Sequence, residues 1–439
     1  MKSGRSFPVI TVAACIIMLI LSSLVCAAPS KKLTLWTGYP EMEPFFKAAA
    51  KWYNELHPDV TIEVASFPLR EVERKYAVSL PTRTGPDIAE CHLYIAQMHI
   101  ENGSIPPNDK KLDSFLKSGV YNPLMVSEST WRGKTYGLPI LFSLDSMLWN
   151  VAMFHEAGFK AGPKDWDEMI SMARKLTRYD SAGRVIRSGL DLRLFGAGSG
   201  VAAKWWYFLK SAGGSLFEEV REGKYKAGYD NEAGFDTTKL YVDGVHKYKF
   251  TSHEIKHDVE AFANEVSAMF VREAWVVGYM RKNAPKVKFD VSPMPAYKKT
   301  NALYFWTNLY VTSSSKYPDI ARDFLMFVAN GPKLKELENI MYNEVGWMPP
   351  RNDVLKRHPD IYEKIPQYKY FSIVPDNYEL YPYPRLSVTD EAFTKLAERL
   401  VKIYQDKKFV DNPDALRTAI HEAANETNEV LKEAGLYAK

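Results

Sequence analysis

The chain has 439 residues, of which 46% are hydrophobic and 25% are charged, and its formal net charge is +4. This composition is typical of a folded soluble protein and excludes disordered and fibrous classes. The near-neutral charge gives no electrostatic reason to expect nucleic-acid binding. With about 150 residues per domain as a guide, the length predicts two or three domains.

The N-terminus has the layout of a secretory signal peptide. Lys2 and Arg5 precede an uncharged, largely apolar run that continues to residue 28 and ends in small residues. We expect cleavage after Ala27, which makes residues 1–27 the signal peptide. A lipoprotein anchored at Cys26 is the alternative, although the bulky residue before it is unusual for such sites.

Removal of this segment changes the charge and the cysteine count. It leaves 55 basic and 53 acidic side chains, a net charge of +2, and Cys91 as the single cysteine. No internal disulfide can then form, so the exported protein must depend on a large hydrophobic core.

Strand and helix patterns alternate in the chain that follows. Apolar residues alternate in the predicted strands and recur every three or four positions in the predicted helices. The predicted order is a strand at 31–38, a helix at 41–56, a strand at 60–64, a helix at 69–80 and a strand at 84–90. This order predicts a parallel sheet in an α/β domain, with ligand-binding loops at 36–43 and 87–94 beyond the strand ends.

Two later stretches are extended and contain proline, which marks them as edge or crossing strands. Residues 136–154 include Pro139, which favours an extended residue before it and cannot donate to a sheet ladder. Residues 288–295 repeat this character about 150 residues later. We interpret the two stretches as the crossings between two domains.

The remaining elements are predicted from the same patterns. They are helices at 166–177, 204–211, 235–246, 254–264, 320–329, 389–404 and 413–434, strands at 188–195, 266–270 and 302–312, and a hairpin at 217–229.

The order of several short motifs resembles a known family. The motifs are Leu-Thr-Leu-Trp from residue 33, Leu-His-Pro-Asp-Val-Thr-Ile-Glu-Val from 56, Thr-Gly-Pro-Asp-Ile-Ala-Glu from 84, Tyr-Gly-Leu-Pro from 136, Asp-Val-Ser-Pro-Met-Pro from 290 and Gly-Trp-Met-Pro-Pro-Arg from 346. With these motifs in this order, the chain resembles the extracellular solute-binding proteins of ABC importers, in the family 1 group that includes maltose-binding protein.

This resemblance implies an α/β, two-lobed periplasmic binding protein fold of type II, with mixed or parallel sheets flanked by helices and a hinge of crossing strands. The implied division is a first lobe of residues 28–140 and 294–332, and a more helical second lobe of 141–293 and 333–439. The implied function is to capture a carbohydrate-like solute and present it to an ABC permease. We expect a periplasmic monomer that uses no cofactor or metal and has no nucleic-acid partner.

The sequence also departs from the family. Members often carry Gly-Gly before the strand written here as 304–311, and an aromatic or acidic residue where this chain has Cys91-His92. Both places lie near the expected cleft, so the solute need not be a common maltodextrin.

Sugars offer C–H faces to aromatic rings and hydroxyl groups to carboxylates, amides and arginine, so a sugar cleft needs these side chains on loops. The first predicted loop supplies Trp36, Tyr39 and Glu41, and the second supplies Glu90 and His92. Trp36 could instead close a core strand, and His92 could be a solvated loop residue.

Later segments supply further candidates. Trp205 lies on a helix beside two other aromatic residues, of which only one or two can share a face. The resemblance places an aromatic residue near Trp275 in the cleft. The other candidates are Trp306, Asn308, Arg351, Tyr381 and Arg385, and Tyr383 belongs to the same set as the last two, which could instead be a packed surface loop.

The same residues give little support to other functions. An exported carbohydrate-active hydrolase would need two facing carboxylates, and no pair is recognisable. His253 and His257 are four residues apart, but no third metal ligand with known spacing follows them. Within the binding class, the solute could be a polyol, a glycerol phosphoester or another small anion.

Overall fold

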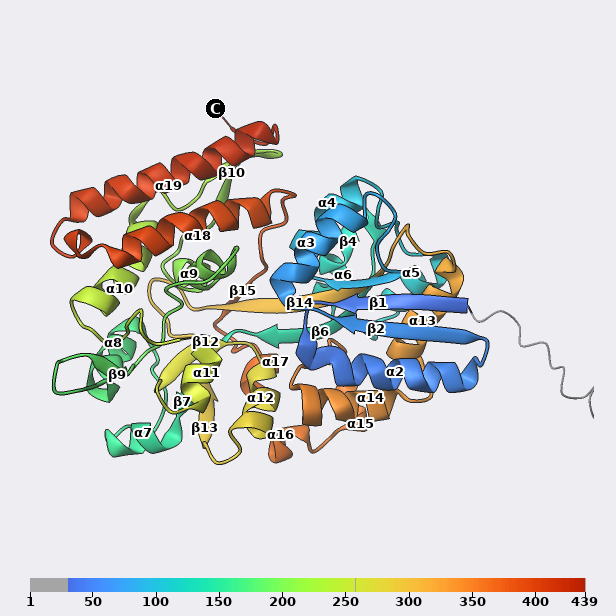
Figure 1. The fold of residues 1–439 in the computed structure, drawn as a ribbon, viewed down its shortest axis with the longest axis horizontal. Coiled ribbons are helices and arrows are strands. Elements are labelled where there is room, and N and C mark those ends of the chain that lie inside the picture. The colour runs from blue at the N-terminus through green and yellow to red at the C-terminus, as the bar shows by residue number, and fades with distance from the viewer. Residues whose placement is uncertain (1–30, 257, 439) are drawn as a thin grey trace, which may run out of the picture.

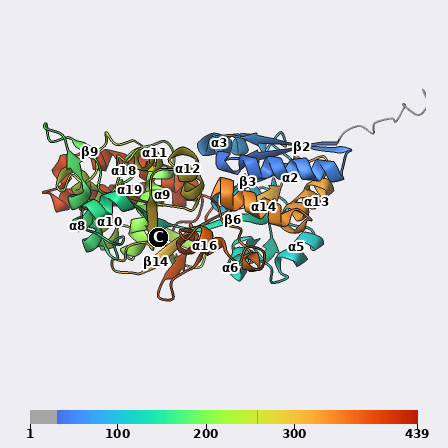
Figure 2. The same ribbon diagram turned by 90° about the horizontal axis from the view of Figure 1, so that it is seen from below.

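The computed structural model describes residues 31–256 and 258–438. The predicted signal peptide and His257 therefore lie outside the described residues. Figure 1 shows two bodies side by side, with strands β6 and β14 running between them, and Figure 2 shows the same division from below. Helices flank the sheets of both bodies.

The first body is built on a six-stranded mixed sheet. Its order is β15-β14-β3-β1-β2, and β6 pairs with β14. β1 runs parallel to β2 and β3, whereas β14 runs antiparallel to β3 and β6. The strands are β1 (Lys31–Thr37), β2 (Val60–Ser66), β3 (Ile88–Cys91), β6 (Leu138–Leu144), β14 (Asn301–Val311) and β15 (Glu379–Tyr381).

The helices around this sheet match the local sequence patterns. Helix α2 buries Phe45, Phe46 and Tyr53 against the sheet, as the spacing of its apolar residues predicts. The helices are α2 (Glu43–Leu56), α3 (Leu69–Ser79), α4 (Leu93–Glu101), α5 (Lys110–Leu116), α6 (Pro123–Glu128), α13 (Pro318–Asn330) and α14 (Leu334–Ile340), with short strands β4 (Thr130–Trp131) and β5 (Lys134–Thr135). A π-helical turn, Met341–Val345, follows α14 and still packs in this core.

The second body holds an antiparallel three-stranded sheet of order β12-β7-β13. These strands are β7 (Ser146–Asn150), β12 (Met269–Arg272) and β13 (Phe289–Ser292). Its helices are α7 (Val151–Glu156), α8 (Trp166–Leu176), α9 (Gly200–Ser211), α10 (Glu232–His246), α11 (Asp258–Ala263), α12 (Trp275–Asn283), α18 (Thr389–Gln405) and α19 (Pro413–Glu433), and its hairpins are β8 (Arg178–Tyr179) with β9 (Val185–Arg187) and β10 (Phe217–Arg221) with β11 (Lys224–Ala227).

One predicted strand was wrong, and the bounds of some predicted helices differ from those observed. Residues 188–195 form no strand and make only an isolated bridge from Ser188 to Ser267. Helix α11 begins at Asp258, four residues after the predicted start at Glu254. The apolar residues of 188–195 are buried by the surrounding chain. Such burial does not require hydrogen bonds to a neighbouring strand.

The chain passes between the bodies several times, and β15 also returns it to the six-stranded sheet before α18. β6 leads directly into β7 at Asp145, and β13 leads into β14 through residues 293–300. The third passage follows the π-helical turn and leads to α15 (Val354–Arg357), α16 (Ile361–Lys364) and α17 (Tyr368–Ser372), which pack near the three-stranded sheet.

Candidate functional site

Aromatic rings from both lobes meet around Tyr383, which follows β15. His92 and Trp206 each lie 4.9 Å from its ring centroid, Tyr94 stacks on it at 5.7 Å, and Phe305 lies at 6.4 Å. His92, Tyr94 and Phe305 come from the sheet and helix α4 of the first body, hereafter the first lobe. Trp206 comes from α9 of the second body, hereafter the second lobe. We call this group the junction cluster.

The end of strand β3 places His92 in this cluster. His92 caps α4, and its Nδ1 accepts a hydrogen bond from the Tyr94 backbone N–H at 3.3 Å. The residue is 1% exposed, and its Nε2 has no hydrogen-bond partner among the described residues. Burial lowers the pKa of His92 well below its ordinary value, so the ring is neutral near pH 7.

The first predicted loop forms a second layer beside the cluster. Tyr39 contacts the rings of Phe305 and Trp347, at 5.8 and 6.5 Å between centroids. Glu41 accepts a hydrogen bond from Trp347 Nε1 at 3.1 Å, and burial raises its pKa. Trp36, in contrast, packs on α3 and the adjoining loop.

Glu90 lies beneath this layer and is fully buried. Its two carboxylate oxygens accept hydrogen bonds from the hydroxyls of Thr37 at 2.5 Å and Thr307 at 2.8 Å. Burial raises the pKa of Glu90 to about 8, against the opposing effect of these hydrogen bonds. The carboxyl group is therefore largely protonated near pH 7.

A buried ionic group lies on the second-lobe side. Lys204 Nζ and the Tyr207 hydroxyl both donate to Glu273 Oε1, at 2.5 and 2.8 Å, and Trp275 Nε1 donates to Oε2 at 3.0 Å. Burial acts to raise the pKa of Glu273, but the charges of Lys204 and Arg272 hold it well below its ordinary value. Glu273 is therefore a fixed negative charge at the junction.

Asp145 lies at the turn between β6 and β7, next to this group. It is 1% exposed, and neither carboxylate oxygen has a hydrogen-bond partner among the described residues. Burial and the charge of Glu273 raise the pKa of Asp145, while Lys204 opposes them. The Tyr207 and Tyr383 hydroxyls, 3.2 Å apart, connect this polar group to the junction cluster.

The other predicted residues lie at different depths. Trp306 is fully buried with its ring 4.5 Å from that of His92. Trp205 is also fully buried but packs edge-on against Tyr229, inside the second lobe. Asn308 is buried and donates to Ser129 Oγ and the Tyr310 hydroxyl, both at 3.1 Å.

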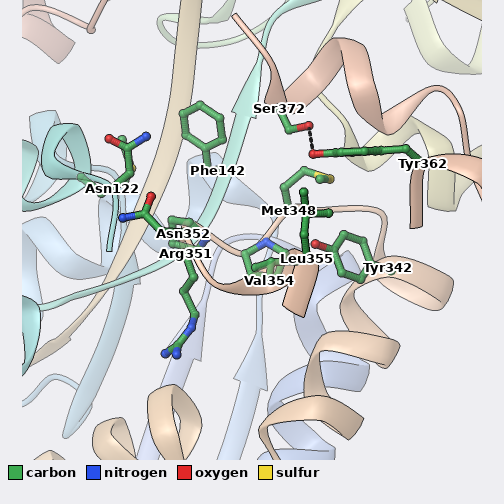
Figure 3. Close-up of a pocket in the computed structure, with 13 residues that line it drawn as sticks. Asn122, Phe142, Tyr342, Met348, Arg351, Asn352, Val354, Leu355, Tyr362 and Ser372 are labelled. Atoms are coloured by element: carbon green, nitrogen blue, oxygen red, sulfur yellow. Dashed lines mark hydrogen bonds between the residues drawn. The ribbon is translucent and has the colours of Figure 1, made fainter. Parts of the chain in front are cut away.

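The last three predicted residues lie away from the cluster. Arg351 borders a cavity of about 190 Å³ behind β6, and Figure 3 shows its guanidinium directed away from the other labelled side chains. It donates to both oxygens of Asp353 at 2.9 Å. Lys210 Nζ lies 3.8 Å from the ring centroid of Tyr381. Arg385 forms an ion pair with the buried Glu128.

Several residues of the junction were absent from the predicted site. They are Asp145, Lys204, Trp206, Tyr207 and Glu273. The pair Lys204 and Tyr207 had a local signal, because residues three apart share a helix face. The others depend on contacts across the chain, which periodicity does not encode.

Two further observations concern metal binding and membranes. In the part of the chain that the structure describes, no group of three His, Cys, Asp or Glu side chains is arranged to hold a metal ion. His253 instead contacts the Tyr404 carbonyl through Nε2, at 3.3 Å. Within residues 31–256 and 258–438, no helix is both long and apolar enough to cross a membrane.

Two α/β bodies joined by shared strands, with a junction lined from both sides, define the two-lobed fold of periplasmic binding proteins. The profile of the bacterial extracellular solute-binding protein family matches residues 48–369. The chain belongs to this family.

Individual proteins agree with this membership. A Brucella abortus (strain 2308) protein described as a binding protein is 24% identical over 257 residues, which are 58% of this chain and 60% of that protein. The chain thus aligns with less than two thirds of that relative. A lactose-binding protein of Rhizobium radiobacter is 25% identical over 69% of this chain and 72% of its own length.

Solved structures share the fold. An ABC transporter solute-binding protein from Thermotoga lettingae TMO, bound with alpha-D-tagatose, superposes with a TM-score of 0.75 at 22% identity, covering 92% of this chain and all of that one. UgpB from Mycobacterium tuberculosis, in complex with glycerophosphocholine, gives 0.75 at 14% identity, covering 92% of this chain and 99% of that one.

Proposed function

We propose that the protein is a periplasmic solute receptor of an ABC importer, which binds a carbohydrate-like solute between its lobes and delivers it to the membrane permease. The observation that carries this proposal is the junction cluster, in which Tyr383 gathers rings from both lobes beside the polar group around Glu273. Stacking surfaces next to carboxylate, lysine and hydroxyl groups suit the two kinds of surface that a sugar presents.

Hinge closure is the proposed mechanism. A solute can stabilise a closed state only if it contacts both lobes more fully in that state than in the open one. Side chains from both lobes converge here, and we propose that the hinge consists of β6, β14 and residues 341–354. Opening at this hinge would separate His92 from Tyr383 and expose Asp145 to the solute.

The similar proteins support a carbohydrate-like solute. The relative from Rhizobium radiobacter is named for lactose, and the Thermotoga lettingae protein is bound with a tagatose. A glycerol phosphoester is the second candidate, because the fold is shared with a protein in complex with glycerophosphocholine. We propose a monomer that does not catalyse a reaction: Glu273 is already engaged by four side-chain donors, which does not suit the free acid–base pair of a glycoside hydrolase.

Two measurements test the proposal. A thermal-shift screen over sugars, polyols and phosphoesters should find a solute that raises the melting temperature, because binding to the folded state stabilises it. Small-angle scattering with that solute should then show a smaller radius of gyration. No stabilisation by any carbohydrate would contradict the solute class. An unchanged radius at saturation would contradict hinge closure, and turnover of the solute would contradict a receptor.

A further inference from the structure

A groove of about 320 Å³ lies between the lobes, next to the junction cluster. Tyr94 borders it and also stacks on Tyr383, so the groove is continuous with the proposed solute site. Arg70 of α3 and His99 of α4 line its first-lobe side. Ser199, which precedes α9, lines the second-lobe side.

The N-terminus of α9 opens into this groove without a cap. The first N–H groups of a helix have no partners within the helix, and they carry the positive end of its dipole. Ser199 makes no side-chain capping hydrogen bond. The residue is 2% exposed, and its Oγ has no hydrogen-bond partner among the described residues. Free N–H groups beside an unused hydroxyl are suited to bind an anion.

Two arginines flank the glycine-rich loop before this helix. A Cβ atom at Gly200 would lie 2.8 Å from Arg193 Nη2, and one at Gly198 would lie 3.2 Å from Arg70 Cδ. The guanidinium of Arg193 therefore lies against the first residue of α9, and Arg70 approaches the loop from the opposite lobe. The small glycines permit both approaches.

Arg193 is a buried cation beside the N-terminus of α9. No ion pair joins it to a carboxylate in the described part of the chain, and its Nε is buried without a hydrogen-bond partner. Burial and the nearby charge of Arg272 lower the pKa of Arg193, although the charges of Asp258 and Glu273 act to raise it. A bound anion would compensate the charge of Arg193.

His99 adds a neutral hydrogen-bonding group on the first-lobe side. It is 1% exposed, and neither ring nitrogen has a partner among the described residues. Burial lowers the pKa of His99 to about 4, so near pH 7 the ring offers one donor and one acceptor. Such a ring can bind a hydroxyl or an anionic oxygen of the solute.

Glu73 and Asp390 also line the groove, and their charges oppose an anion. Both are close to Arg70, whose Nη1 lies 2.6 Å from Glu73 and 3.8 Å from Asp390. Arg70 therefore offsets only part of these two negative charges, and the anion would bind at the α9 N-terminus, beside Ser199 and near the guanidinium of Arg193.

We propose that this groove binds an anionic group, a phosphate or a carboxylate, carried by the solute. The inference rests on the proposed function, and it narrows the solute to an acidic sugar or a phosphorylated sugar or polyol. Because Arg70 and α9 belong to different lobes, the anion would also contribute to closure.

The test uses matched neutral and anionic probes. Titration calorimetry at constant ionic strength compares glycerol with glycerol 3-phosphate, and glucose with glucose 6-phosphate and glucuronate. We expect at least one anionic probe to bind about tenfold more tightly than its neutral parent, as charge-assisted hydrogen bonds would provide. Equal or tighter binding of both neutral parents would overturn the inference but leave the proposed receptor intact.

Two matched variants locate the site. Ser199→Asp places a carboxylate at the α9 N-terminus, whereas Ser199→Asn adds a neutral side chain of similar size, and both residues are good N-caps. We expect Ser199→Asp to weaken anionic-probe binding about tenfold or more and Ser199→Asn to weaken it much less. Equal effects of the two substitutions would overturn the assignment of this groove.

A second pair controls for overall charge. Arg193→Gln should remove most of the preference for the anionic probe, whereas Arg221→Gln, on the exposed hairpin β10–β11, should leave it unchanged. Equal losses in both would show only a non-specific charge effect and would overturn the site. If no probe binds and the radius of gyration never changes, this inference and the proposed function both fail.

Discussion

His92 and Tyr383 meet edge to face at the lobe junction, with 4.9 Å between their ring centroids and 71° between their planes. One ring caps a helix of the first lobe, and the other packs on Trp206 of the second. In the proposed closure mechanism, a solute that enters between the lobes would separate this pair.

Removal of the central ring should weaken solute binding. Tyr383→Ala deletes the surface that both lobes share, and we expect affinity for the identified solute to fall at least tenfold, in the range of lost aromatic stacking. Calorimetry measures this directly. Tyr368→Ala is the control, since Tyr368 is fully buried in a separate core. It should lower the melting temperature without a comparable loss of affinity, and equal losses in the two variants would refute the role of Tyr383.

Glu90 should make stability depend on pH. Its folded-state pKa of about 8 lies above the ordinary value of 4.5. The protonated folded form is thus favoured below pH 4.5, and this contribution is lost as the pH rises from 4.5 to 8. We expect Glu90→Gln, which stays neutral, to flatten the decline in unfolding free energy over this range.

Urea unfolding at several pH values measures the Glu90 effect, whose upper bound is about 4–5 kcal/mol. Glu55→Gln, at an exposed position of α2, should leave the profile as in the wild type. A Glu90→Gln profile parallel to that of the wild type would show that Glu90 does not titrate in this range.

The buried pair of Lys204 and Glu273 should be costly to break. Lys204→Met leaves the Glu273 carboxylate with less compensation in a buried site, and we expect a loss of about 3 kcal/mol in unfolding free energy. The double variant with Glu273→Gln should lose less than the sum of the single variants. Because the pKa of Glu273 is lowered, the pair's contribution is present above pH 4.5 and lost on acidification.

A surface pair provides the comparison. Lys226 and Glu218 lie 3.2 Å apart with about half of each side chain exposed. Lys226→Met should change the unfolding free energy by less than about 1 kcal/mol. If Lys204→Met were equally mild, the buried network would be structurally unimportant.

A proline in the β6 passage should alter closure and affinity together. The Phe142 backbone N–H donates to the Met348 carbonyl at 2.8 Å, which links β6 to the passage that follows the π-helical turn. Phe142→Pro removes this donor and restricts the backbone. We expect a lower melting temperature, weaker solute binding and a smaller solute-dependent change in radius of gyration. Unchanged affinity in the folded variant would argue that β6 is not part of the hinge.

The sequence by itself determined the local elements and the family. Strand β1, helix α2 and helix α3 lie within two residues of their predicted bounds, because apolar periodicity and turn residues act over short distances. The ordered motifs likewise indicated a two-lobed solute-binding protein, and the profile of that family matches residues 48–369.

The tertiary structure alone decided which side chains meet. Trp205 and Trp206 are equally apolar neighbours, but about 100° of helical rotation separates them, and only packing places Trp206 against Tyr383 and Trp205 in the core. The same holds for Lys204 and Glu273, and for Glu90 and Thr307, whose contacts join distant segments. Local patterns specify which side of a helix or strand is buried, whereas the segment that packs against that side depends on the fold of the whole chain.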